Sequence, residues 1–234
     1  MLYLWIERRY IPKGEDQMDN DTDKVAANAD PVKVVVWYDY IWPWCYVGLE
    51  RVDRLALEHN IWVEGRAYLL RPDTPKEGLL REPRSGETSG ELSEPLRSNA
   101  LESNLVMRPP KVTPNTNYIL EATEYAQQHG KFLEFHHAAY KAYWEYGEEL
   151  GDLGVIKTIA DRVSLDTDEL LHSLENHSYS QIVMAQYQQA LEYGIKGIPT
   201  FLVGNLMFTG AHPYEIFQSA LSKFLAGPDD TAVA

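Results

Sequence analysis

Cysteine is the scarcest chemistry-bearing residue in this chain, since Cys45 is the only one among 234 residues. One thiol excludes a disulfide within the chain. It also excludes a redox cycle between two cysteines of the same protein, because the second thiol must resolve the mixed disulfide that the first one forms. Such sparing use of cysteine fits a reducing compartment, so we expect a cytoplasmic protein.

Positive charge is also in short supply, with 21 basic against 35 acidic residues and a formal net charge of −14. A chain of this sign is repelled by nucleic acid and by anionic membranes, and we expect neither as a partner. No apolar run approaches the roughly 20 residues that a membrane-spanning helix needs. The short apolar patch at the start precedes its basic residues, which is the reverse of a secretory signal.

The first part of the chain has little to bury. Residues 12–31 are polar and acidic, so we predict that residues 1–31 form a flexible segment. The sequence leaves open whether translation starts at Met1 or at Met18. Hydrophobic residues nevertheless make up 44% of the whole chain, which is enough for a substantial core in the remainder.

The folded part begins with a strand, a helix and a second strand. Residues 32–40 are β-branched and aromatic, which predicts a strand buried on both faces. Pro43 suits the first position of a helix, and the apolar spacing predicts that this helix runs to about Glu58. Residues 61–72 read as the second strand, so the pattern is a β-α-β unit with parallel strands.

The sequence pattern changes twice in the rest of the chain. A stretch rich in Pro, Gly, Ser and charge follows the second strand and predicts a long surface loop. Residues 98–193 then have helical spacing, with glycines at the expected helix ends. After Gly194 the pattern predicts two short strands joined by a Gly-Asn turn and a final helix behind Pro213. The fold class is therefore α/β, as β-α-β, a helical block and β-β-α.

This order of elements resembles the thioredoxin-like core with the helical insertion of the DsbA family. Five separated segments carry the resemblance to its FrnE-like subgroup of thiol–disulfide oxidoreductases. They are "PWCYVG" at 43–48, "LLRPDTPKEG" at 69–78, "NTNYILEATEYAQQHGKFLEFHHAAYKAYWEYGEELGD" at 115–152, "GIKGIPTFLVG" at 194–204 and "GAHPYEIF" at 210–217. The resemblance covers residues 32 to 225.

The resemblance implies a domain division. Residues 32–80 and 194–234 would form the thioredoxin-like core, and residues 81–193 would form the helical insertion domain. It also implies that the site is the groove between the turn at 42–45, the segment 198–200 and the inserted helices.

One departure from the family concerns the nucleophile. The family turn reads C-P-W-C, whereas this chain reads W-P-W-C, so Trp42 stands where the nucleophilic cysteine belongs. Cys45 stays the candidate catalytic residue, acting as a single thiol, or else the member is degenerate. Its position is that of the family's shielded second thiol, and burial makes a thiol inert. A reactive Cys45 and a buried, purely hydrophobic Cys45 both stay open.

The second landmark of the family is a cis-proline, and the resemblance implies that the Ile198–Pro199 bond is cis and faces the turn. The backbone beside it would pair with an extended peptide or with glutathione, as strand pairs with strand. The expected partner is thus a small thiol or an extended peptide or protein client. The candidate binding residues are Trp42, Pro43, Trp44, Ile198, Pro199, Thr200 and His212.

Two alternative functions stay open. Proteins of the kappa glutathione transferase and hydroxychromene-carboxylate isomerase type use no cysteine of their own, because glutathione is a co-substrate that supplies the thiol. They have a serine at the first position of the turn and a G-x-D-R segment, where this chain has Trp42 and "GAHP" at 210–213. The other alternative is a non-catalytic module that binds a peptide or thiol. We expect no bound cofactor in any of these cases.

Other polar residues give weaker signals. His136 and His137 lie near Glu134, but adjacent histidines on a helix point in different directions and no H-E-x-x-H motif is present. We therefore expect no metal site. Asp39 precedes the turn, where it either accepts hydrogen bonds from the turn's backbone or tunes Cys45. The sequence does not indicate the oligomeric state.

Overall fold

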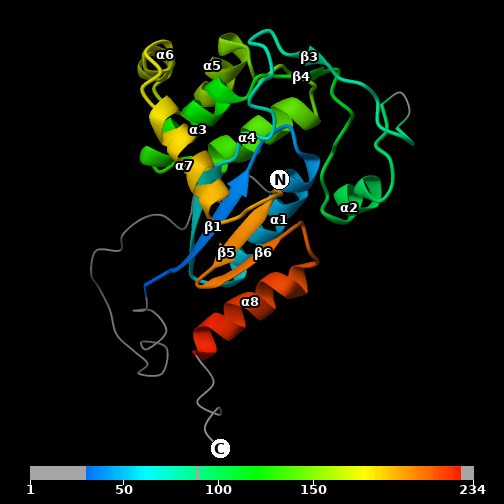
Figure 1. The fold of residues 1–234 in the computed structure, drawn as a ribbon, viewed down its shortest axis with the longest axis vertical. Helices are drawn as coiled ribbons and strands as arrows, with labels where there is room; N and C mark the ends of the chain where they lie inside the picture. The colour runs from blue at the N-terminus through cyan, green and yellow to red at the C-terminus, as the bar shows by residue number, and fades with distance from the viewer. Residues whose placement is uncertain (1–29, 88–89, 228–234) are drawn as a thin grey trace, which may run out of the picture. The chain divides into compact units, whose positions relative to one another are not determined.

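The computed structural model describes residues 30–87 and 90–227, and the described residues from Pro31 onward form one compact unit. The segment predicted to be flexible, residues 1–31, lies almost entirely outside the described residues. The predicted α/β class is confirmed by a four-stranded mixed sheet that helices surround (Figure 1). The strand order is β2-β1-β5-β6. The bounds are Val32–Tyr38 for β1, Ile61–Ala67 for β2, Thr200–Val203 for β5 and Leu206–Thr209 for β6.

The β-α-β unit forms as predicted. Strands β1 and β2 run parallel, from Val32 opposite Ile61 to Tyr38 opposite Ala67, and helix α1 (Pro43–Glu58) is the crossover that parallel strands require. Strand β2 ends at Ala67, earlier than the predicted residue 72. The physical reason is that the backbone N–H of Leu70 donates to the Asp39 carboxylate and not to a neighbouring strand.

The β-β-α half completes the sheet. Strand β5 pairs antiparallel with both β1 and β6, and helix α8 (Tyr214–Ala226) follows. Helix α8 lies beside α1, where the Arg54 guanidinium sits 4.0 Å from the centre of the Tyr214 ring. The Tyr214 hydroxyl donates to Glu58 at 2.6 Å, which ties the end of α1 to the start of α8.

The helical block covers the open edge of β2. Figure 1 shows these helices gathered above the sheet, with α8 below it. The side-chain oxygen of Gln127 accepts from Gly65 N–H at 2.8 Å, and that of Gln186 accepts from Ala67 N–H at 2.7 Å. Amide side chains thus satisfy strand donors that would otherwise be exposed at an edge. The bounds are Asn117–Gln128 for α3, Phe132–Trp144 for α4, Leu153–Arg162 for α5, Thr167–Glu175 for α6 and Ser180–Glu192 for α7.

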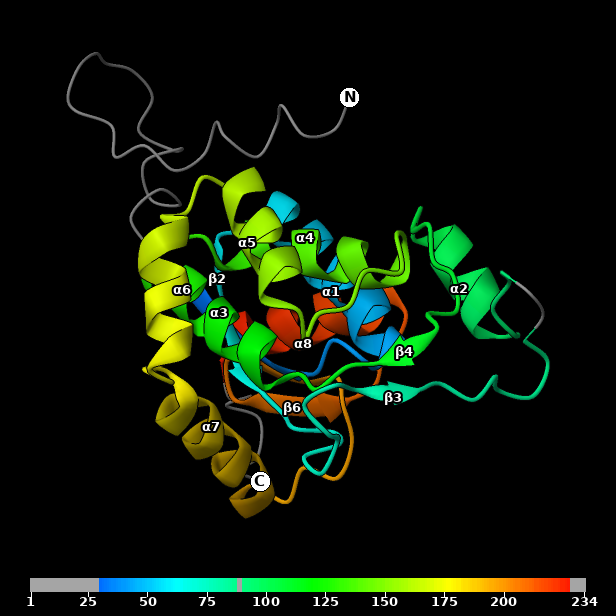
Figure 2. The same ribbon diagram turned by 90° about the horizontal axis from the view of Figure 1, so that it is seen from above.

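The predicted surface loop and the start of the predicted helical stretch contain structure that the sequence did not indicate, and residues 103–116 are not helical. Strands β3 (Leu79–Leu80) and β4 (Val112–Thr113) form a two-stranded antiparallel ribbon, and helix α2 (Leu96–Glu102) lies between them in the chain (Figure 2). Strands of two residues are too short to show an alternating pattern. The ribbon joins chain segments from both sides of the predicted domain boundary at residue 80.

Helix ends follow the sequence closely. The Asp166 side chain accepts from the backbone N–H groups of Asp168 and Glu169, so it caps the start of α6. Gly130 and Gly194 follow α3 and α7 with φ of 68° and 70°, a conformation that favours glycine. Within the described part of the chain, no helix combines the length and the apolar character needed to cross a membrane.

Candidate functional site

The first turn of α1 holds the residue that replaces the family nucleophile. Trp42 is the N-cap residue with extended backbone, Pro43 occupies the first helical position, and no side chain caps the helix. The backbone N–H of Trp42 donates to the Asp39 carbonyl at 3.2 Å, and that of Cys45 donates to the Trp42 carbonyl at 3.0 Å. The backbone is therefore a closed turn that presents the indole at the mouth of the helix.

Side chains of the helical block fix the segment that leads into this turn. Trp144 Nε1 of α4 donates to the Tyr40 carbonyl at 2.9 Å, and the Tyr140 hydroxyl donates to the Asp39 carbonyl at 3.3 Å. The Tyr40 hydroxyl lies 2.6 Å from Thr123 Oγ1 of α3. The insertion thus sets the approach of the chain to α1.

Asp39 is fully buried and holds the turn through its carboxylate. Its Oδ1 accepts from Ile41 N–H at 3.2 Å, while its Oδ2 accepts from Leu70 N–H at 2.9 Å and from the Thr116 hydroxyl at 3.3 Å. Burial raises the pKa of the Asp39 carboxyl to about 7, although these hydrogen bonds oppose the increase. Asp39 therefore has the structural role that its position before the turn suggested.

Cys45 lies behind the turn with only 2% of its surface exposed. Burial raises the pKa of the Cys45 thiol well above its ordinary value. A hydrogen bond to the Asp39 backbone lowers this pKa, whereas the negative charge of the Asp39 carboxylate raises it. A thiol that is shielded and protonated is a poor nucleophile. The geometry therefore favours the buried, hydrophobic interpretation of Cys45.

The opposite wall comes from the segment before β5, where the Ile198–Pro199 bond is cis. Helix α1 approaches this wall so closely that a Cβ atom on Gly48 would lie 2.8 Å from Phe201 Cζ and 3.1 Å from Pro199 Cγ. A side chain at this crossing would force Phe201 or the helix to shift, so glycine suits the position. The absence of a side chain at residue 48 brings the turn and Pro199 together.

The polar groups beside Pro199 are largely satisfied by the protein itself. The Pro199 carbonyl accepts from Gly210 N–H at 2.7 Å. Thr200 is buried, and its hydroxyl lies 2.7 Å from both the Gly197 carbonyl and Thr209 Oγ1. Ile198 is different, because its backbone makes no hydrogen bond to any residue in the described part of the chain.

An open groove of about 480 Å³ lies between these two walls, and we call it the Ile198 groove. It brings together four of the predicted residues, namely Trp42, Trp44, Ile198 and His212. The other four, Cys45, Pro43, Pro199 and Thr200, are not among the residues that line it. Asn99, Gly210, Ala211 and Pro213 line the groove as well.

Asn99 comes from the short helix α2, at the start of the stretch with helical spacing, and was not predicted because no segment that carries the family resemblance contains it. His212 has one ring nitrogen engaged, since Nε2 lies 2.9 Å from the Thr209 carbonyl. A carbonyl only accepts, so Nε2 carries the proton of this hydrogen bond.

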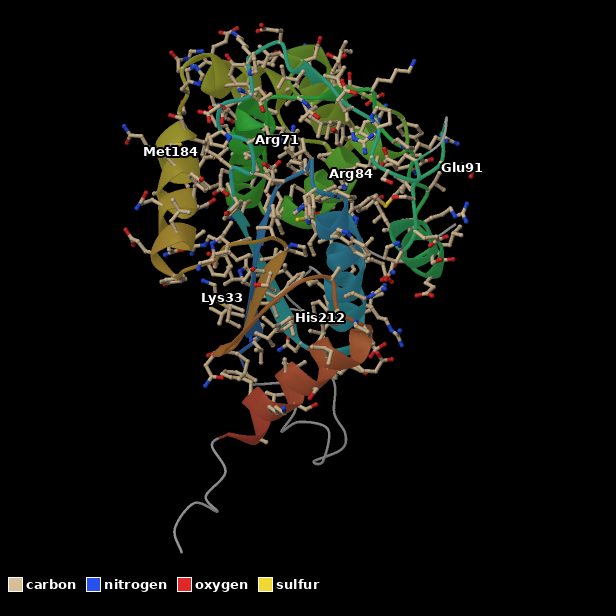
Figure 3. The ribbon with its side chains drawn as sticks, turned by 45° about the vertical axis from the view of Figure 1, so that its right-hand side comes forward. Lys33, Arg71, Arg84, Glu91, Met184 and His212 are labelled. Carbon is tan, nitrogen blue, oxygen red and sulfur yellow. The ribbon has the colours of Figure 1, made fainter. Side chains whose placement is uncertain are left out.

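A second cavity of about 260 Å³ lies against Trp42 on another side and was not predicted. We call it the arginine pocket, because Arg71, Arg81 and Arg84 line it together with Trp42. The Arg84 guanidinium lies 4.9 Å from the centre of the Trp42 ring. Figure 3 shows Arg71 and Arg84 in the upper part of the view and His212 lower, toward α8. In the sequence, the only indication of this pocket was the occurrence of three arginines between residues 71 and 84 of an otherwise acidic chain.

The adjacent histidines have separate surroundings. His136 is buried among aromatic rings, including that of Tyr140, whose centre is 4.8 Å from its own. His137 Nε2 pairs with the Asp53 carboxylate at 2.7 Å. Among residues 30–87 and 90–227, no three His, Cys, Asp or Glu side chains are grouped to hold a metal ion.

Comparison with known proteins gives consistent matches. The sequence profile of the DSBA-like thioredoxin domain matches residues 33–222. The uncharacterized protein YwbO from Bacillus subtilis is 24% identical over 196 residues, which are 82% of this chain and 96% of YwbO.

Two solved structures share the fold. A probable DsbA oxidoreductase from Streptomyces coelicolor has a TM-score of 0.74 at 21% identity, covering 87% of this chain and 94% of its own. A 2-hydroxychromene-2-carboxylate isomerase has a TM-score of 0.68 at 16% identity, covering 86% of this chain and 100% of its own. At these identities the likeness establishes the fold alone.

Proposed function

Because this chain belongs to the family of DSBA-like thioredoxin domains, we propose that it binds an extended peptide or a small thiol in the Ile198 groove, without dithiol exchange. The observation that carries the proposal is the state of Cys45, the single thiol, which is 2% exposed. Exchange requires an accessible thiolate, and burial raises the pKa of this thiol instead. The protein is then a family member that keeps the binding groove and lacks the nucleophile.

The backbone at Ile198 supports binding of an extended chain. Its N–H and carbonyl make no hydrogen bond within the described residues, whereas the next carbonyl, of Pro199, is paired with Gly210. An extended ligand can pair with a free backbone segment as an added strand does, while side-chain contacts supply selectivity. Trp42, Trp44 and Ala211 offer apolar surface on either side of that segment. Glutathione is a small ligand that has both a peptide backbone and a thiol.

Calorimetric titration tests this proposal. Reduced glutathione, S-methylglutathione and an end-blocked apolar tetrapeptide are titrated into the wild type, Trp44→Ala and Trp62→Ala. Trp62 is the matched control, since it is 43% exposed on β2. We expect binding to the wild type and the control, weakened at least tenfold in Trp44→Ala. If none of the three ligands binds the wild type, the proposal is wrong.

A redox assay addresses the single-thiol alternative. Reduction of insulin by dithiothreitol should be no faster with the wild type than with Cys45→Ser. A rate that the wild type shows and Cys45→Ser loses would establish exchange through Cys45 and contradict the proposal.

A second candidate is glutathione-dependent transfer or isomerisation. Two observations favour it over single-thiol exchange: the shielded Cys45, and the fold shared with a 2-hydroxychromene-2-carboxylate isomerase. In that chemistry glutathione, held as a thiolate, would replace the missing protein nucleophile. Trp42 offers only an indole N–H there, and residues 210–213 lack the acid and the arginine of the G-x-D-R segment.

Difference absorbance at 240 nm on mixing with reduced glutathione reports thiolate formation. An increase at neutral pH that S-methylglutathione does not give would favour this second candidate over simple binding. Cytoplasmic location and membership of the FrnE-like subgroup stay predictions from the sequence.

A further inference from the structure

The arginine pocket carries positive charge that the protein does not neutralise. Arg81 is paired, because its guanidinium donates to both oxygens of Glu87 at 2.6 and 2.9 Å, and the Glu87 side chain is 2% exposed. Arg71 and Arg84 make no ion pair with any carboxylate of the described residues. Glu82 also lines the cavity and forms no ion pair there, so the pocket has a net charge of about +1 in a chain of −14.

Arg84 is held in place without being neutralised. Its guanidinium lies over the Trp42 ring, and the Glu87 carboxylate accepts from its backbone N–H at 2.8 Å. Burial lowers the pKa of Arg84, and the positive charges of Arg81 and Arg71 lower it further. The negative charge of Glu87 raises this pKa and so opposes them. These guanidinium groups line one cavity, so their like charges repel one another, and an anion placed among them would relieve that repulsion.

The remaining walls are apolar. Ile41 and Leu70 line the cavity, and so do Leu79 and Leu80 of the β3–β4 ribbon. These two leucines are unusually exposed, at 45% and 85%. Apolar side chains beside two unpaired guanidinium groups suit a ligand with an apolar body and one acidic group.

The size of the cavity limits the ligand. Its volume of about 260 Å³ is below the roughly 300–1,000 Å³ of pockets that take drug-sized molecules. A folded client or a long peptide does not fit such a space, whereas a small organic acid does. Guanidinium donors lie in one plane and match the two oxygens of a carboxylate or phosphate.

We propose that the arginine pocket binds a small organic anion, whose carboxylate or phosphate is held by Arg71 and Arg84 and whose apolar body contacts Leu79 and Leu80. The site is separate from the Ile198 groove and does not depend on the function proposed for that groove. The two cavities share Trp42, so this indole contacts the occupant of each.

The test is calorimetric titration of the full chain with matched aromatic probes. Benzoate and phenyl phosphate carry the two acidic groups, benzyl alcohol is the neutral counterpart, and benzylamine is the cation. We expect both anions to bind, with affinity that falls as salt rises, and the other two not to bind. Whichever anion binds more tightly identifies the acidic group that the pocket prefers.

Variants locate the binding. Arg71→Gln and Arg84→Gln should each weaken anion binding at least tenfold, whereas Arg162→Gln on α5 and Trp44→Ala in the groove should leave it unchanged. Arg71 is exposed and without an ion pair among the described residues, so its replacement leaves the fold intact. Failure of both anions to bind the wild type would overturn the proposal. Equal binding of benzyl alcohol, or wild-type affinity in Arg71→Gln, would overturn it too.

Discussion

The two cavities that share Trp42 differ in what surrounds them. The Ile198 groove is lined by the two halves of the thioredoxin-like core and by Asn99, and its lining contains no arginine, lysine or carboxylate. The arginine pocket is lined by the loop after β2, the β3–β4 ribbon and helix α4, with three guanidinium groups. The groove follows from the fold, whereas the charge of the pocket belongs to segments that connect the fold's elements. A change of chemistry is therefore possible beside the ancestral site without a change of the core.

The largest expected effect follows from replacing the shared residue, by Trp42→Cys. A thiol at the N-cap of α1 would have its thiolate stabilised by the helix N-terminus, one turn before Cys45. Insulin reduction should rise from no catalysis to a rate at least about tenfold above the uncatalysed reaction. Trp42→Ser is the control and should stay inactive. If Trp42→Cys is inactive although folded, the groove no longer supports exchange, and its likeness to an oxidoreductase site is structural only.

The accessibility of Cys45 tests whether the protein on the core side of Trp42 shields the thiol from solvent. Since the thiol is buried and its pKa is raised, alkylation by iodoacetamide in the native protein should be slower by about two orders of magnitude than in denaturant. Mass spectrometry of timed samples measures the rate. Labelling at similar rates in both conditions would show an open, reactive Cys45.

The pH dependence of stability tests the buried carboxylate beneath the turn. The pKa of Asp39 is about 7 in the folded protein against an ordinary 3.8, so the folded state holds this proton more tightly than the unfolded chain does. Its contribution to the free energy of unfolding is fully present below pH 3.8 and is lost as the pH rises toward and through 7. Between pH 5 and pH 8 the loss should be roughly 2–3 kcal/mol.

Urea denaturation at pH 5 and pH 8 measures this contribution. Asp39→Asn removes the titrating group, so the variant should show a smaller decrease between the two pH values, whatever its stability at either one. An equal decrease in both proteins would mean that Asp39 does not titrate in this range.

The smallest expected effect concerns the contact that brings the groove's two walls together. Gly48→Ala places a methyl group against Phe201 and Pro199, and such overpacking should lower the free energy of unfolding by about 1–3 kcal/mol. Gly151→Ala is the matched control, because the nearest atom to its Cβ is 3.5 Å away, an ordinary contact. Denaturation midpoints compare the two variants. Equal midpoints would mean that α1 has room to move away from Pro199.

Most of the fold was predictable because its signals are local. The apolar run of β1, Pro43 at the start of α1 and the glycines after α3 and α7 each act on their own neighbours in the chain. The β3–β4 ribbon was not predictable, since two-residue strands have no pattern and their pairing joins residues more than 30 positions apart. Strand β2 was predicted too long because its end depends on the Leu70–Asp39 hydrogen bond, which spans 31 positions.

The site was predictable in part for the same reason. Family segments identified Trp42, Trp44, Ile198 and His212, which do line one groove. The same segments also selected Thr200, whose hydroxyl the structure engages internally, and passed over Asn99. Arg71 and Arg84 were visible as charges, but nothing local in the sequence indicated that both line a cavity with Trp42.

The sequence by itself determined that this chain has one thiol and therefore no dithiol cycle, because covalent composition does not depend on folding. It also determined the order of the four strands of the main sheet and of the longer helices, because backbone preferences and apolar spacing act over a few residues. Only the tertiary structure decided that Cys45 is shielded and that Trp42 contacts two cavities of opposite character. The burial of a side chain and the electric field around it depend on atoms from segments that are distant in the chain, and only folding brings those segments together.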